Sequence, residues 1–276
     1  MNSDFIPVCV GRFVVDVPRA AEVISKEFKI EGDSLEFTRM GLEKHKQFLV
    51  EREKHLRTSP TLEEGELKRV ASGKTEHSRI FARGRDKPFA LYEFEGYALS
   101  KDFLSGVQLK LTSLLSNAAE IDKRIEAVSY DLARFSNRRD NDIPTEDGFC
   151  VNGGFFAGKP ATGGESALIY YRLTQHPDVL VQIIISVNGT NLEPTLLQRN
   201  STPLPPALKS QAHLIKTLRR GKHPVGPLPG EEVLELFNDK GLGRHEFYWQ
   251  VQGKPTSLYE PAISFELITG LDTNGQ

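Results

Sequence analysis

The sequence has few of the residues that mark metal, redox or membrane proteins. It contains only two cysteines, Cys9 and Cys150, in 276 residues. Two cysteines so far apart supply neither a zinc-finger ligand set nor a Cys-x-x-Cys redox pair. No apolar run approaches the roughly 20 residues that a membrane-spanning helix needs. We therefore expect no metal, no cofactor and no membrane span.

The chain also has no large excess of positive or negative charge. The chain has 35 basic and 37 acidic residues and a formal net charge of −2, which argues against a nucleic acid as partner. One concentrated basic cluster consists of Lys216, Arg219, Arg220, Lys222 and His223. A membrane surface or a phosphate could bind there, but the cluster also lies at the carboxyl end of a helix that we predict for residues 207–220, where cations are favourable.

The motifs of common catalytic sites are incomplete. Gly73-Lys74-Thr75 lacks the glycine that a phosphate-binding loop needs at position 68, which is a lysine. His245-Glu246 lacks the second histidine of a zinc-protease helix, because position 249 is a tryptophan. No Gly-x-Ser-x-Gly nucleophile motif is present. We therefore predict no catalytic residue and expect that the protein is not an enzyme.

The first half of the chain has the pattern of a sheet with covering helices. Residues 5–17 predict one strand that ends at Pro18. The residues rich in Glu, Lys and Leu at 39–58 predict a surface helix, and a single apolar stripe predicts a second helix between Asn117 and Phe135. Further strands are predicted at 23–30, 35–38, 67–72, 77–82, 89–94 and 107–111. The last four of these are expected to be separated by Gly73, Gly84, Gly96 and Gly106.

A polar segment at residues 136–148 predicts a linker between two domains. We place the N-terminal domain at residues 1–140 and the C-terminal domain at 141–276. The second domain is predicted to contain helices at 207–220 and 230–237, and strands at 149–156, 167–173, 179–187, 245–251 and 262–271. Residues 179–187 are apolar enough for a central strand that is buried on both faces. Both domains are therefore of the α+β class, each a mainly antiparallel sheet covered by helices.

A chain of two domains without a catalytic motif is most simply a binding protein. Binding surfaces are rich in Tyr, Trp and Arg, and two short segments offer these residues. Arg83, Arg85 and Asp86 lie in a charged segment that we expect to project as a turn between two strands. Tyr248 and Trp249 include the only tryptophan of the chain. Trp249 would fit the hydrophobic core equally well.

Two segments that contain the cysteines carry a family resemblance. These are Cys9-Val10-Gly11-Arg12-Phe13-Val14-Val15-Asp16-Val17-Pro18 and the stretch from Ile143 to Gly154, with Gly148-Phe149-Cys150-Val151-Asn152-Gly153-Gly154 at its end. They resemble the immunity proteins cognate to type VI secretion lipase effectors, and the likeness extends over essentially the whole chain. From the residues alone, the two cysteines could equally form one disulfide or remain two small buried thiols.

The resemblance implies two α+β domains and a non-enzymatic inhibitor of a phospholipase. Such a protein would bind its cognate effector as a 1:1 complex in the periplasm, gripping it between the two domains and blocking access to the substrate. An oxidising periplasm favours a disulfide between Cys9 and Cys150. Two departures are that no leader precedes Met1, which we attribute to its removal, and that the chain stops at Gln276, where the C-terminal domain of related chains continues.

Two other functions and one other location are kept as alternatives. The protein could be a hydrolase that uses carboxylates in an interdomain cleft, or an envelope protein that binds lipid or has a structural role. A cytoplasmic location is the alternative to the periplasm. Neither the effector nor the choice between steric and allosteric inhibition follows from the sequence.

Overall fold

The structure is a computed structural model. It describes residues 4–59, 61, 65–85, 91–100, 107–139, 141–161, 163–201, 212–239 and 242–271. The chain forms two compact units that interleave along the sequence. The first unit consists of residues 1–7, 16–27 and 166–276, and the second of residues 8–15 and 28–165. The predicted division between residues 140 and 141 stays a prediction.

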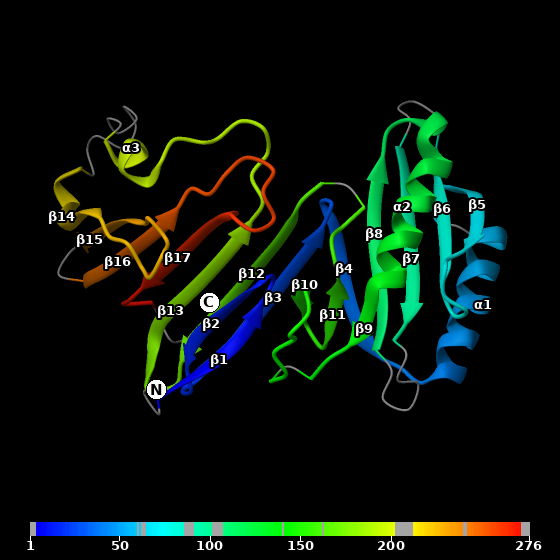
Figure 1. Ribbon diagram of the computed structural model, residues 1–276, viewed down its shortest axis with the longest axis horizontal. Coiled ribbons are helices and arrows are strands. Elements are labelled where there is room, and N and C mark those ends of the chain that lie inside the picture. Colours follow the sequence, from blue (N-terminus) through cyan, green and yellow to red (C-terminus); the bar gives the residue numbers. More distant parts are fainter. Residues whose placement is uncertain are drawn as a thin grey trace. The chain divides into compact units, whose positions relative to one another are not determined.

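The first unit is built on an antiparallel sheet (Figure 1). Its hydrogen-bonded strand order is β14–β15–β16–β17–β13–β12–β3. The strands are β3 (Ala21–Ile30), β12 (Glu165–Leu173), β13 (His176–Ser186), β14 (Ile215–Lys222), β15 (Glu231–Asp239), β16 (Leu242–Val251) and β17 (Ala262–Ile268). A five-residue helix, α3 (Leu196–Asn200), packs on β15 and is closed by a capping box at Thr195.

Strand β13 is central, as predicted, but it is buried on one face only. Alternate residues such as Val181, Ile183 and Ile185 are 4–9% exposed, whereas Gln182 and Ile184 between them are half-buried. A continuous apolar run therefore does not imply two covered faces here. The prediction of burial on both faces is wrong, because the apolar side chains on the second face, such as Ile184, are only half-buried.

Two predicted helices of the second half are strands. Residues 215–220 of the helix expected at 207–220 lie in β14, and residues 202–211 are outside the described ranges. The helix expected at 230–237 is β15, which pairs with β14 on one side and β16 on the other. An acidic pair such as Glu231-Glu232 is typical of the first turn of a helix, but the pairing of Glu232 with Trp249 decides the local structure.

The second unit contains a sheet with helices on both faces (Figure 1). From the end of β3 its strand order continues β4–β8–β7–β6–β5. The elements are β4 (Asp33–Arg39), α1 (Leu42–Thr58), β5 (Glu66–Ser72), β6 (Arg79–Arg85), β7 (Leu91–Leu99), β8 (Val107–Leu115), the 3-10 helix η1 (Ala118–Glu120) and α2 (Ile121–Arg134). Both predicted helices of this half are confirmed, and so are its strands from β3 to β8, although residues 89–90 and Gly106 lie outside the described residues.

Neighbouring residues of β7 show how the two helices cover the sheet. Tyr97 packs edge-on against Phe48 of α1, with ring centroids 5.0 Å apart. A Cβ at the next position, Gly96, would lie 2.6 Å from Val128 Cγ1 of α2. Because successive side chains of a strand point to opposite faces, α1 and α2 cover opposite faces. Gly96 thus permits close packing of α2 and does not separate two strands, and the same correction applies to Gly84, which lies inside β6.

Two predicted single strands are hairpins. Residues 5–17 form β1 (Phe5–Val10) and β2 (Phe13–Pro18), joined at Gly11, which has φ 58°. Residues 149–156 form β10 (Gly148–Val151) and β11 (Gly154–Ala157), joined at Asn152-Gly153 with φ 66° at Gly153. A positive φ favours glycine. Strand β9 (Phe135–Asn137) pairs with β11 to complete a three-stranded sheet.

The turn of the first hairpin is joined to the second hairpin within the second unit. Gly11 and Cys150 form an antiparallel bridge with Gly11 N–Cys150 O at 3.2 Å and Cys150 N–Gly11 O at 2.8 Å. Cys9 and Cys150 form a disulfide with their Cα atoms 5.9 Å apart. With mainly antiparallel sheets and few helices, the α+β class predicted from the sequence is confirmed.

Candidate functional site

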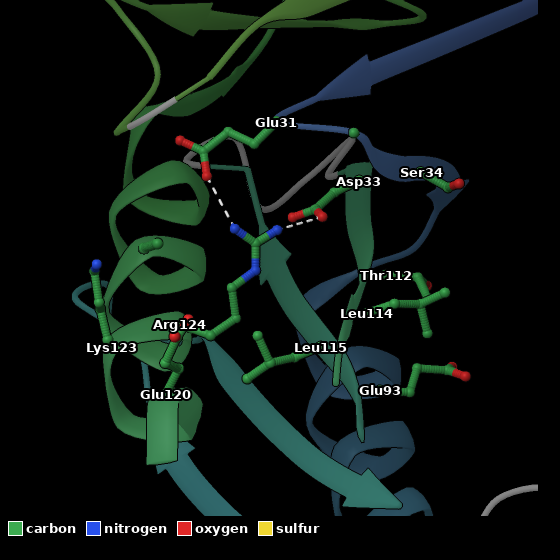
Figure 2. Close-up of a pocket in the computed structure, with 12 residues that line it drawn as sticks. Glu31, Asp33, Ser34, Glu93, Thr112, Leu114, Leu115, Glu120, Lys123 and Arg124 are labelled. Atoms are coloured by element: carbon green, nitrogen blue, oxygen red, sulfur yellow. Dashed lines mark hydrogen bonds and ion pairs between the residues drawn. The ribbon is translucent and has the colours of Figure 1, made fainter. Parts of the chain in front are cut away.

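A pocket of about 550 Å³ opens in the second unit at the end of β8 (Figure 2). Its position follows from strand lengths, because β4 pairs with β8 only as far as Ser34 and Thr112 while β8 runs on to Leu115. The β3–β4 turn and the start of α2 close the space beside the free end. Leu114 and Leu115 supply apolar lining, and the charged lining consists of Glu31, Asp33, Glu93, Glu120, Lys123 and Arg124.

Arg124 lies in the middle of this pocket and holds α2 to the β3–β4 turn. Its Nη1 is 3.0 Å from Glu31 Oε2, and its Nη2 donates to Asp33 Oδ1 (Figure 2). Its Nε donates to Ser113 Oγ. The side chains of Glu31 and Asp33 are 3% and 6% exposed. Burial raises the pKa of Asp33 to about 6, and this effect outweighs the attraction of Arg124.

The chemistry that this pocket offers is that of a buried ion-pair cluster. A carboxyl with a pKa near neutrality is a usual feature of general acids, but the described contacts of Asp33 and Glu31 in the pocket are with Arg124 and Ser113. Within the described residues, no group of three or more His, Cys, Asp or Glu side chains is placed to hold a metal ion. The arrangement positions α2 and leaves a mixed charged and apolar rim.

The first part of the charged segment, Arg83 to Arg85, lies in a strand and not in a projecting turn. Arg83 lies in β6, is 8% exposed, and pairs with Glu95 at 2.9 Å and Glu93 at 2.5 Å. Arg52 and Tyr97 also bond to Glu95. Burial would raise the pKa of Glu95, but these hydrogen bonds and the two arginine charges hold it below its ordinary value. Arg83 is therefore held inside the second unit.

Arg85 and Asp86 are the other two candidates of that segment. Arg85 is the last residue of β6, and Asp86 lies outside the described residues. The role of Arg83, Arg85 and Asp86 in partner binding stays a prediction.

Tyr248 and Trp249 lie next to each other in β16 and point to opposite faces of the sheet in the first unit. Trp249 is 7% exposed, and its Nε1 donates to the backbone oxygen of His223 at 2.7 Å. Tyr248 is half-buried and donates its hydroxyl to Glu246 Oε2 at 2.7 Å. The core position considered for Trp249 is thus the one observed, and Tyr248 alone belongs to the more open face. Their role in partner binding also stays a prediction.

The face that carries Tyr248 gathers three carboxylates that the sequence analysis did not single out. Glu235 of β15 lies directly opposite Glu246 of β16, and Glu266 of β17 lies directly opposite Tyr248. Burial and the charge of Glu246 raise the pKa of Glu266. The two-residue spacing of Glu246 and Tyr248 was visible in the sequence, but Glu235 was assigned to a helix, so the cross-strand pairing could not be inferred.

The basic cluster lies along β14 and not at a helix end. Arg219 pairs with Glu232 at 2.6 Å, and Arg220 donates to the backbone oxygen of Leu197 in α3 at 2.7 Å. The helix-dipole explanation of this cluster is therefore wrong. Among the described helices, none combines the length and the hydropathy that crossing a bilayer requires.

Comparison with known families assigns both halves of the chain. Residues 6–146 match the model of the Tle cognate immunity protein 4 N-terminal domain, and residues 142–276 match the model of the Tle cognate immunity protein 4 C-terminal domain. No match to a curated protein was found.

Solved structures of similar fold cover nearly the whole chain. A chain of the Tle4–Tli4 complex superposes with a TM-score of 0.84 at 26% identity, covering 100% of this chain and 89% of that one. The apo immunity protein TplEi of the T6SS from Pseudomonas aeruginosa gives a TM-score of 0.83 at 26% identity, with 99% and 90% covered. TplEi in complex with an "L" peptide gives 0.75 at 24% identity, with 98% and 88% covered, and shows the shared fold.

Proposed function

Because this chain belongs to the Tle cognate immunity protein 4 family, we propose that it binds a Tle effector of the type VI secretion system and neutralises it. The observation that carries this proposal is the match of both family domains, one after the other, along the whole chain. We propose a 1:1 complex, with a phospholipase as the effector and blocked access to its substrate as the mechanism. The protein would then act by binding and not by catalysis.

The proposal includes a periplasmic location. Disulfides persist in oxidising compartments such as the bacterial periplasm, and the bond between Cys9 and Cys150 supports such a location. The cysteines close a long stretch of chain, which suits a protein that must stay folded outside the cytoplasm.

Purified protein should be mixed with the lipase encoded beside its gene and analysed by size-exclusion chromatography with light scattering. We expect a 1:1 complex and loss of phospholipid cleavage at equimolar inhibitor. A non-cognate lipase serves as the control and should remain active. Full lipase activity in the presence of excess protein would contradict the proposed function, and turnover of lipid by the protein alone would support the hydrolase alternative.

A further inference from the structure

The half-open face of the sheet in the first unit has the composition of a protein-binding surface. One row of residues crosses four strands, with Tyr170 of β12, Gln182 of β13, Glu266 of β17 and Tyr248 of β16 directly opposite one another in turn. All four are half-buried. We refer to Glu235, Glu246, Tyr248 and Glu266, the acidic end of this face, as the acidic face.

Apolar side chains flank that row on both sides. Leu180 and Ile268 form one neighbouring cross-strand pair, and Leu168 lies opposite Ile184 on the other side. These four side chains are also half-buried. Tyrosines beside aliphatic side chains and a few charges are typical of the centre of protein interfaces.

Two carboxylates of the acidic face, Glu235 and Glu246, lie where their charges repel, although Glu235 also accepts a hydrogen bond from Asn200 Nδ2 of α3 at 3.1 Å. Like charges directly opposite in neighbouring strands are destabilising, and Glu235 lies directly opposite Glu246. Glu266 is diagonal to Glu246 and adds a third negative charge. The cation that bonds to these carboxylates is Arg244, whose Nη2 bonds to Glu246 Oε1 and whose Nε is buried without a partner. Arg220 and Lys222 of β14 lie farther along the same face, opposite Val233 and Glu231. Three carboxylates and one arginine give this end of the face a net negative charge.

Protection of a sheet edge does not explain these charges. Charged residues often keep edge strands from pairing with other chains, but β15, β16 and β17 each have a neighbour on both sides. Solubility does not explain them either, since it is served by fully exposed acids, whereas the Glu246 side chain is 16% exposed. A carboxylate held half-buried beside others at a cost in stability is an arrangement expected where a partner supplies the opposite charge.

We propose that the acidic face binds a basic segment of the effector, with lysine or arginine side chains placed against Glu246 and Glu266 and apolar side chains against the flanking rows. This inference rests on the proposed function and names the surface that performs it. Arginine is particularly suited, because its guanidinium bonds two carboxylates at once and its stem packs on tyrosine rings.

The test compares two double variants that change the net charge equally. Glu246→Gln with Glu266→Gln removes charge from the acidic face, whereas Glu22→Gln with Glu193→Gln removes it from exposed positions of the first unit. Affinity for the neighbouring lipase is measured by calorimetry at two salt concentrations. We expect the first variant to bind at least tenfold more weakly and with less salt dependence, and the control to bind within twofold of the unmodified protein.

The outcomes separate this inference from the proposed function. If the unmodified protein binds the lipase and both variants bind equally well, the acidic face is not the binding surface, although the proposed function stands. If the unmodified protein does not bind, the proposed function is wrong and this inference falls with it. Thermal unfolding of Glu266→Gln alone guards against misfolding: we expect unchanged or higher stability together with weaker binding, and lower stability with unchanged binding would overturn the inference.

Discussion

Arg12 and Glu165, which are 153 positions apart in the sequence, form a buried bidentate ion pair in the second unit. Arg12 Nε is 2.5 Å from Glu165 Oε2, and Nη2 is 2.8 Å from Oε1. The same guanidinium reaches Asp147 and the backbone oxygen of Gly158, each at 2.7 Å. Because the two paired side chains are 4% and 2% exposed, the turn of the first hairpin is fixed to residues far along the chain.

Arg12→Ala should destabilise the protein strongly. Removing one partner of a buried ion pair leaves an uncompensated charge and costs about 3 to 5 kcal/mol, and burial already raises the pKa of Glu165 with Arg12 present. Urea unfolding at neutral pH measures the loss. Arg19→Ala, at an exposed position of the first unit, is the control and should change stability by less than about 0.5 kcal/mol. Equal effects of both substitutions would show that the Arg12 contacts contribute nothing specific.

Reduction of the disulfide should also destabilise the chain. Cys9 and Cys150 are separated by 141 positions, and constraining so long a loop in the unfolded state is worth up to about 4 to 5 kcal/mol in the chain-entropy model. Denaturant unfolding with and without reductant measures the difference. The double variant Cys9→Ala with Cys150→Ala should match the reduced protein and no longer respond to reductant. A variant as stable as the oxidised protein would contradict this expectation.

Local patterns predicted the elements whose structure depends on near neighbours. The apolar stripe of α2 and the short strands of the meander in the second unit belong to this group, because each shows the period of its own element within a few residues. The failures were at β14 and β15, whose residues Leu234 and Leu236 fit a helix or a strand equally well. The pairing of β15 with both β14 and β16 decides the outcome, and a single sequence does not show which strands pair.

The candidate site was predictable only in part for the same reason. Tyr248 and Trp249 were singled out as a pair, but the alternation of a strand places one on each face. Glu235, Glu246 and Glu266 come together only through the register of three strands. The buried position of Arg83 depends on Glu93 and Glu95 in the next strand. Such cross-strand contacts follow from tertiary structure and leave no mark at one position of the sequence.

Asp33 should make the protein less stable as pH rises from about 4 to about 7. Its pKa is raised from 3.8 to about 6 in the folded protein, so the folded state binds the proton more tightly than the unfolded chain. This proton binding contributes about 3 kcal/mol to the free energy of unfolding. The contribution is complete below pH 4 and is lost as pH rises through 6.

The test for Asp33 compares the protein with Asp33→Asn at pH 4, 5, 6 and 7. Asp131, whose pKa burial also raises to about 6, titrates in both proteins, so the difference between their free energies of unfolding isolates Asp33. We expect the advantage of the unmodified protein over the variant to shrink as pH rises. An advantage that grows with pH would mean that Arg124 stabilises the Asp33 anion more than burial opposes it.

Gly96→Ala should loosen the packing of α2 on β7. The new Cβ would lie 2.6 Å from Val128 Cγ1 and 3.1 Å from Leu132 Cδ1, so the helix must shift at a cost of about 1 to 3 kcal/mol. Gly189→Ala is the matched control, because no atom lies within 4 Å of its added Cβ. The control should be neutral or slightly stabilising through reduced freedom of the unfolded chain. Thermal unfolding distinguishes the two, and equal midpoints would refute the close packing at Gly96.

Substitutions at Tyr248 and Trp249 should separate binding from stability. Trp249 is enclosed by Gly230, at which an added Cβ would lie 2.2 Å from the indole ring, so Trp249→Ala should cost about 3 to 5 kcal/mol of stability. Its affinity for the effector should fall only as far as the protein unfolds. Tyr248 is half-buried on the opposite face, so Tyr248→Ala should weaken binding about tenfold or more while the protein remains folded.

Tyr248→Phe isolates the hydroxyl group from the ring. Its hydrogen bond to Glu246 restrains that carboxylate, and its loss should weaken binding less than loss of the whole ring. For Trp249→Ala and Tyr248→Ala, the affinity for the effector is measured by calorimetry and the stability by the midpoint of thermal unfolding. Because strand alternation places the two side chains on opposite faces, the result that fits this structure is a crossed one, with Trp249 governing stability and Tyr248 governing affinity. If both substitutions changed only stability, Tyr248 would be a structural residue and the binding surface would have to lie elsewhere.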